Sequence, residues 1–292
     1  LRFTLATGNS PGNDMRFSDE KVEASRNFAN KIWNAARFIL MNLGDNEPTP
    51  HIPENLALED KWILSKYNEL VKGVTESLEK YELGMAVQKL YDFIWDVFCD
   101  WYIEIAKIRL SCEDEELKKC AKAVLVYVMS NTLKLLHPFM PFITEEIWQT
   151  LPHEGESIMI SPWPEYSENL VFLNEEADME KIMTAVKAVR NRRAEMNVPP
   201  SKKAQLNIVT KDTELFSDGA KFFTRLASAS EIGVSEKESV FNLEGAVSVV
   251  TEAATIYIPM DELVDFKAEL ERLEKEKKAV LKEIDFLNSK LN

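Results

Sequence analysis

Apolar residues recur every three or four positions through most of the first half of the chain. Over residues 19–43 this spacing predicts a helix, with Ser18 as its N-cap and Gly44 as its end. Helices of the same periodicity are predicted over 59–81, 83–110, 113–136 and, after a bend at His137-Pro138, 141–150. The helix over 83–110 has a broad apolar face, which is typical of the centre of a helix bundle.

The pattern changes beyond about residue 175, where helices alternate with short strands. The sequence predicts a helix over 175–196, a strand over 204–209, a helix over 212–228 and a hairpin of strands 247–250 and 255–258. This order predicts a small α+β domain. The fold class as a whole is mostly α.

A heptad pattern covers the last segment of the chain. From Leu263 to Leu291, steps of three and four residues land on apolar side chains except at Lys277. Such a seam needs a partner helix, because one amphipathic helix cannot bury its own stripe. We expect either an antiparallel return helix outside this sequence or self-association through the unpaired seam.

These patterns divide the chain into five parts. We predict a connector, a helical bundle, a linker, a small α+β domain and a coiled-coil helix over residues 1–17, 18–152, 153–174, 175–260 and 261–292, respectively. The sequence starts without Met and ends inside the heptad pattern. We therefore expect an excised piece of a longer chain.

Composition is that of an ordinary globular protein, with 45% hydrophobic and 29% charged residues. Only 9 of 292 residues are glycine, which favours helices over a turn-rich β-protein. Three dispersed cysteines without a Cys-x-x-Cys pair exclude a disulfide framework and a thiolate zinc site. With no long apolar run and no signal-peptide layout, the sequence predicts a soluble cytoplasmic protein without membrane contact.

The net charge of −14 by itself argues against a nucleic-acid partner. The charge is unevenly distributed, however. Residues 181–203 hold seven basic and one acidic side chain, and residues 1–43 six and four, whereas residues 54–120 hold nine and fifteen. Because phosphate neutralisation is local, an acidic protein with concentrated basic surfaces can still bind a polyanion.

Two segments carry candidate binding residues. On the helix over 19–43, amide, cationic and aromatic side chains lie on or beside one stripe: Asn27, Asn30, Lys31, Asn34, Arg37 and Phe38. Single-stranded RNA is read by such mixtures, because bases stack on rings while amides contact base edges. The alternative places Phe38 and Trp33 in the core and leaves the asparagines solvated. The second segment carries Lys187, Arg190 and Arg193 at three-residue intervals, suited either to phosphate contacts or to an ordinary solvated face with ion pairs.

Sequence motifs for catalysis are absent. The chain contains no phosphate-binding P-loop, no Gly-x-Ser-x-Gly and no His-Glu-x-x-His, and His51, His137 and His153 are dispersed. We therefore predict no catalytic residue, no metal site and no cofactor in this chain.

Four stretches resemble one family of proteins. Residues 136–148 (LHPFMPFITEEIW) resemble the anticodon-binding helical domain of class I aminoacyl-tRNA synthetases for branched aliphatic amino acids. Residues 1–17, 27–38 and 190–198 narrow the resemblance to the valyl-tRNA synthetases of bacteria. The HIGH and KMSKS signatures of class I catalysis are absent.

The resemblance implies a C-terminal fragment that binds valine tRNA through its anticodon. It implies a monomeric parent ligase that attaches valine using ATP with magnesium, a junction domain, and a coiled-coil arm that contacts the tRNA. By position in the matched motif, Lys31 and Phe38 are the first expected anticodon contacts and Asn34 and Arg37 the next, while Arg190 and Arg193 are expected on the tRNA backbone. The alternative is a helical interaction module that docks a protein partner through its coiled coil.

Overall fold

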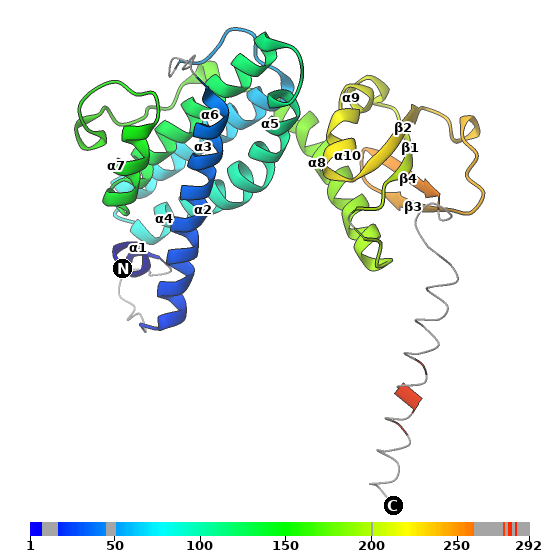
Figure 1. Ribbon diagram of the computed structural model, residues 1–292, viewed down its shortest axis with the longest axis horizontal. Helices are drawn as coiled ribbons and strands as arrows, with labels where there is room; N and C mark the ends of the chain where they lie inside the picture. The colour runs from blue at the N-terminus through cyan, green and yellow to red at the C-terminus, as the bar shows by residue number, and fades with distance from the viewer. Residues whose placement is uncertain are drawn as a thin grey trace, which may run out of the picture. The chain divides into compact units, whose positions relative to one another are not determined.

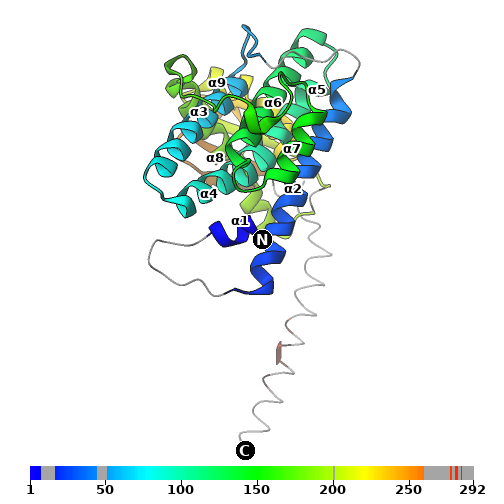
Figure 2. The same cartoon turned by 90° about the vertical axis from the view of Figure 1, so that its left-hand side faces the viewer.

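Helices build most of the structure, a computed structural model that describes residues 1–7, 17–44, 51–199 and 201–259 and the single positions 277, 280, 281 and 284 (Figures 1 and 2). The chain divides into two units, Leu1–Glu180 and Lys181–Asn292. In the first unit the elements are α1 (Arg2–Ala6), α2 (Asp19–Leu43), α3 (Leu58–Glu79), α4 (Leu83–Asp92), η1 (Phe93–Tyr102), α5 (Ile103–Leu110), α6 (Glu115–Leu136), α7 (Pro141–Thr150), η2 (Ile158–Ile160) and η3 (Glu168–Leu170). Helix α8 (Leu173–Glu195) starts in the first unit and ends in the second. The predicted mostly α fold is confirmed.

Capping residues set the bounds of α2. The Ser18 side chain accepts a hydrogen bond from the Lys21 N–H. The carboxylate of Asp19 lies in the first turn, where its negative charge interacts favourably with the positive end of the helix dipole. The helix ends at Gly44, whose φ of 72° suits a residue without Cβ. The predicted helix 19–43 is therefore confirmed residue for residue.

The predicted helix over 83–110 is continuous but changes its winding. Between α4 and α5, residues Phe93–Tyr102 form a π-helix, η1, and the Ile103 N–H donates to the Phe98 carbonyl five residues earlier. Its buried face carries Ile94, Phe98 and Tyr102. A π-helix is rare, and neither periodicity nor composition had predicted it.

Part of the predicted connector 1–17 is helical and packed. Helix α1 buries Phe3, whose ring stacks on Phe28 of α2 with centroids 4.9 Å apart. Thr4 adds a hydrogen bond of 2.8 Å to Ser25. Burial of an aromatic ring therefore stabilises a helix that is too short to form by itself.

A charged cluster lies inside the bundle, between α3 and α5. Arg109 exposes 4% of its surface and donates from both terminal nitrogens to Asp60, while its Nε lies 3.2 Å from Glu59 Oε1. Tyr102 donates a hydrogen bond of 2.8 Å to Asp60. Burial by itself lowers the pKa of Arg109, but the hydrogen bonds and charge of Asp60 raise that pKa overall above its ordinary value.

The second unit builds a mixed sheet against helices. Its elements after α8 are β1 (Ala204–Thr210), α9 (Thr213–Asp218), α10 (Ala220–Leu226), β2 (Ala229–Ser235), η4 (Glu238–Val240), β3 (Ala246–Val250) and β4 (Ala254–Pro259). The strand order is β2-β1-β4-β3, with β1 parallel to β2 and the other pairs antiparallel. Alternate residues such as Leu206, Ile208 and Ile256 are buried, and α9 and α10 lie on one side of the sheet (Figure 1).

Two features of this unit differ from the sequence prediction. The helix predicted over 212–228 is two helices that meet at Gly219, where an added Cβ would come within 2.9 Å of Ile182 Cδ1. Strand β2 follows in a segment for which no strand was predicted, while β1 and the hairpin of β3 and β4 are confirmed. Of the described strands, β2 and β3 form the two edges of the sheet.

The heptad prediction for 261–292 lies outside the described residues, apart from four positions: 277, 280, 281 and 284, all helical. In the described part of the chain, no helix combines the length and apolarity needed to cross a bilayer. Across the same residues, no group of three or more His, Cys, Asp or Glu side chains is arranged to hold a metal ion.

Candidate nucleic-acid interface

Helix α2, the blue helix in Figure 1, presents one polar stripe at the surface of the bundle. Four exposed polar residues follow steps of three and four along it, Asn27, Asn30, Asn34 and Arg37, and the exposed apolar Met41 continues the spacing. Its buried residues form the opposite face: Phe28, Ile32, Ala35, Ala36, Ile39 and Leu43. Since residues three and four apart share a helix face, the structure brings the predicted amides and Arg37 together.

Aromatic and cationic side chains flank this stripe. Trp33 is 46% exposed, whereas Lys31 and Phe38 are half-buried. The alternative that placed Trp33 in the core is therefore wrong, and Phe38 is not sealed in the core either. The α2 surface, as we call Asn30, Lys31, Asn34, Arg37, Phe38 and Trp33 together, combines hydrogen-bonding groups with rings that solvent reaches.

Lys31 contacts two residues of η1. Its ammonium forms an ion pair with Asp100 and lies 4.5 Å from the centre of the Trp95 ring. Both partners keep part of their surface in solvent, with 28% of the Lys31 side chain and 48% of the Asp100 side chain exposed. The helix packed beside α2 therefore contributes to the same surface.

Phe38 is flanked by a cation in a similar way. Lys107 of α5 places its Nζ 5.3 Å from the centre of the Phe38 ring and also forms an ion pair with Glu104 one turn earlier. The Phe38 carbonyl accepts a hydrogen bond from Asn42. The ring and the nearby ammonium can together contact an unstacked base and its phosphate.

The residues that sequence reasoning missed lie 60 to 70 positions beyond their partners on α2: Trp95, Asp100 and Lys107. Their placement depends on the pairing of η1 and α5 with α2, which local periodicity does not encode. The signal available in the sequence was the broad apolar face of residues 93–102. In an α-helix, these apolar side chains would cover most of the circumference.

In the second candidate segment, Lys187 and Arg190 are exposed, whereas Arg193 is buried. Arg190 is exposed, but Arg193 exposes 6% of its surface and donates from Nη2 to the carbonyls of Lys202 and Pro199. Burial lowers the pKa of Arg193. The structure therefore corrects the expected pairing of Arg190 and Arg193 on one surface: Arg193 holds backbone carbonyls in its own unit, and Arg190 is the one that solvent reaches.

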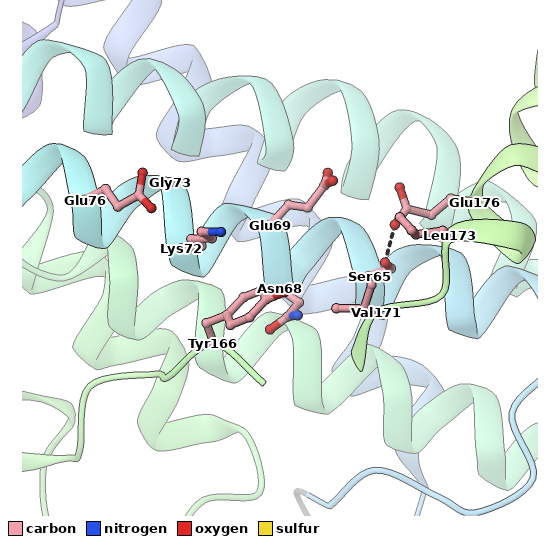
Figure 3. Close-up of a pocket in the computed structure, with 10 residues that line it drawn as sticks. All are labelled: Ser65, Asn68, Glu69, Lys72, Gly73, Glu76, Tyr166, Val171, Leu173 and Glu176. Atoms are coloured by element: carbon pink, nitrogen blue, oxygen red, sulfur yellow. Dashed lines mark hydrogen bonds between the residues drawn. The ribbon is translucent and has the colours of Figure 1, made fainter. Parts of the chain in front are cut away.

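A groove of about 360 Å³ opens on the first unit between α3 and the chain leading into α8 (Figure 3). Its lining includes the carboxylates of Glu69, Glu76 and Glu176, with Lys72 5.2 Å from the centre of the Tyr166 ring. Glu176 also accepts a hydrogen bond from Ser65 (Figure 3). The excess of carboxylates makes this groove a poor site for a polyanion.

Comparison with known proteins gives the family. A family described as "Anticodon-binding domain of tRNA ligase" matches residues 60–208, about half of the chain. Valine--tRNA ligases are similar over most or all of it: 51% identical over 276 residues for Clostridium tetani, 50% over 296 for Clostridium acetobutylicum and 48% over 297 for Carboxydothermus hydrogenoformans. These matches cover 94%, 100% and 100% of the chain but 31%, 33% and 33% of the relatives, so the chain spans about a third of their length. The chain belongs to the family of tRNA ligases with this anticodon-binding domain.

Proposed function

We propose that this chain is the tRNA-binding part of a valine--tRNA ligase and reads the anticodon of valine tRNA with the α2 surface. The observation that carries the proposal is the exposed stripe of Asn30, Asn34 and Arg37, flanked by the partly exposed rings of Trp33 and Phe38. Amides and guanidinium groups contact base edges, and rings stack on bases that leave the helical stack. Arg190 is a further proposed contact, to the RNA backbone.

The family and the relatives support this assignment from a second direction. The matched family is described by anticodon binding, and the relatives named above are valine--tRNA ligases. The stripe on α2 precedes the residues matched by the family but lies within the range shared with the relatives. In the whole ligase, ATP and magnesium are proposed to act outside this chain, because the class I signatures are absent from it.

The overall negative charge does not oppose the proposal. Affinity for RNA depends on the cations that contact phosphate, and the logarithm of the binding constant then falls linearly with the logarithm of salt concentration. We expect a modest slope here, because the α2 surface holds few cations and pairs Lys31 with a carboxylate.

A binding titration tests the proposal. Valine tRNA transcript and the same transcript with a replaced anticodon are titrated against the chain at low salt, and we expect clearly tighter binding of the native anticodon. Equal affinity for both transcripts, or no binding to either, would refute anticodon reading by this chain.

Substitution of Phe38 tests the role of its ring. Phe38→Ala is expected to weaken binding by about 1 to 3 kcal/mol if a base stacks there. Phe38→Leu keeps apolar volume without the ring and should weaken binding similarly, which separates stacking from packing. Phe142→Ala, at a phenylalanine of α7 that is 89% exposed, is the matched control and should leave affinity unchanged. Unchanged affinity of both Phe38 variants with intact helical circular dichroism removes Phe38 from the interface.

We also propose that the coiled-coil helix predicted over 261–292 acts as an arm that contacts the tRNA. Its self-association stays a prediction. Light scattering over a range of protein concentrations measures it, with and without valine tRNA. A mass that stays constant with concentration would contradict self-association.

A further inference from the structure

The π-winding of η1 brings two side chains five residues apart onto Lys31. In an α-helix, residues five apart point about 140° away from each other. In η1, where hydrogen bonds span five residues, Trp95 and Asp100 both contact the Lys31 ammonium. The winding therefore builds a three-residue group, Lys31, Trp95 and Asp100, at the edge of the α2 surface.

The charges of this group do not fit a phosphate site. Asp100 neutralises Lys31, and carboxylates one turn away on either side belong to Asp96 and Glu104. Asp96 is exposed, and Glu104 is half-buried and paired with Lys107. A row of carboxylates repels a polyanion, so a lysine placed here purely for phosphate would lose much of its attraction.

The edge of a nucleobase carries hydrogen-bond donors and acceptors that Asp100 and Lys31 can bind. Asp100 offers acceptor lone pairs, and the Lys31 ammonium has three donors, of which the Asp100 contact uses one. Adenine and cytosine each carry an amino donor beside a ring nitrogen that accepts. Uracil has no exocyclic amino group. On the Watson–Crick edge of guanine, the amino group lies beside a ring N–H that would face the lysine as a second donor.

We propose that Asp100 and Lys31 read one anticodon base as a donor–acceptor pair and that Asp100 is a specificity-determining residue. Asp100 accepts from the exocyclic amino group of an adenine or cytosine, and Lys31 donates to the neighbouring ring nitrogen. Trp95 holds the ammonium in place through its ring face. This inference rests on the proposed function, because it names how the α2 surface selects a base.

The test removes the amino group from the RNA and the carboxylate from the protein. Valine tRNA is prepared with one anticodon adenine or cytosine at a time replaced by the same base without its exocyclic amino group. For the native chain, we expect one such replacement to weaken binding roughly 5- to 150-fold, the range of a good two-bond base contact. For Asp100→Ala, the same replacement should change the dissociation constant less than about twofold. For Asp100→Asn, which keeps one acceptor oxygen, the effect should be intermediate.

Asp96→Ala is the matched control, since it removes an equal charge one turn away from the proposed contact. Loss of a carboxylate should tighten binding of every transcript alike, so only the ratio between native and altered transcripts reports base reading. The inference is overturned if Asp100→Ala keeps the ratio of the native chain, or if Asp96→Ala loses the ratio equally.

Failure of the proposed function gives a different result. In that case, replacing the whole anticodon leaves binding by the native chain unchanged. If replacing the anticodon weakens binding by the native chain but no single amino deletion does so through Asp100, the α2 surface reads the anticodon and only the role of Asp100 is refuted.

Discussion

Replacing Arg109 with methionine should strongly destabilise the first unit. The guanidinium balances two carboxylates inside the bundle, and Asp60 and Glu59 expose 0% and 1% of their surface. Arg109→Met leaves both carboxylates buried without their cation. Removal of one partner from a buried ion pair typically costs about 3 to 5 kcal/mol, and we expect a loss of that size in the free energy of unfolding.

Urea unfolding followed by tryptophan fluorescence measures the stability of the first unit, which contains Arg109. All six tryptophans lie between residues 33 and 163, so their emission reports the first unit, and Trp62 lies two positions after Asp60 on α3. Lys107→Met is the matched control, because its ion pair with Glu104 is partly exposed and should contribute less than about 1 kcal/mol.

A double substitution separates charge balance from packing. With Asp60→Asn added to Arg109→Met, one buried charge is removed together with its partner, so the double variant should lose less stability than the sum of the two single variants. A loss below about 1 kcal/mol for Arg109→Met, or strict additivity in the double variant, would refute the reasoning from buried charge.

Two further predictions concern pH and close packing. Burial lowers the pKa of His137 below 6.5, with Arg2 acting in the same direction and Glu145 against it, so the unfolded chain binds more protons. The free energy of unfolding should therefore fall as pH decreases from about 7 to 5, and His137→Gln should flatten this dependence in paired urea titrations; identical pH profiles would contradict it. At Gly233 an added Cβ would lie 2.6 Å from the Phe241 ring, so Gly233→Ala should cost about 1 to 3 kcal/mol, seen as faster amide hydrogen exchange in β1 and β2. Adding Phe241→Ala should relieve part of that loss, and unchanged exchange in Gly233→Ala would show that the ring moves freely.

Helix positions could be predicted from the sequence where local chemistry sets them. Helix α2 begins after the N-cap Ser18 and ends at Gly44, which has a positive φ. Helix α7 begins with Pro141, at a position where the missing N–H of proline costs no hydrogen bond. These signals depend only on neighbouring residues. The bounds of both helices were therefore predicted correctly.

Other elements depend on contacts between distant residues. Helix α1 forms because Phe3 stacks on Phe28, and β2 forms as an edge strand because it pairs in parallel with β1. Its residues Ser230 and Glu231 are exposed, so the strand lacks a clear alternating apolar pattern. Neither element has a strong local signal.

The candidate interface shows the same division. Spacing along α2 correctly placed Asn30, Asn34 and Arg37 on one face, because the 3.6-residue period is a local property. The contributions of Trp95 and Asp100 follow from the winding of η1 and its packing beside α2. The sequence alone therefore predicted the residues that α2 contributes but not those that η1 contributes.

The edge position of β3 has a consequence for behaviour at high protein concentration. Residues Ala246–Val250 carry no charge and no proline, and Val250 is largely exposed, so the outer backbone of this strand can template pairing with another chain. Two exposed carboxylates, Glu244 and Glu252, bracket the strand. Because identical strands paired in parallel and in register would bring these like charges together, we expect the two glutamates to oppose such pairing at neutral pH.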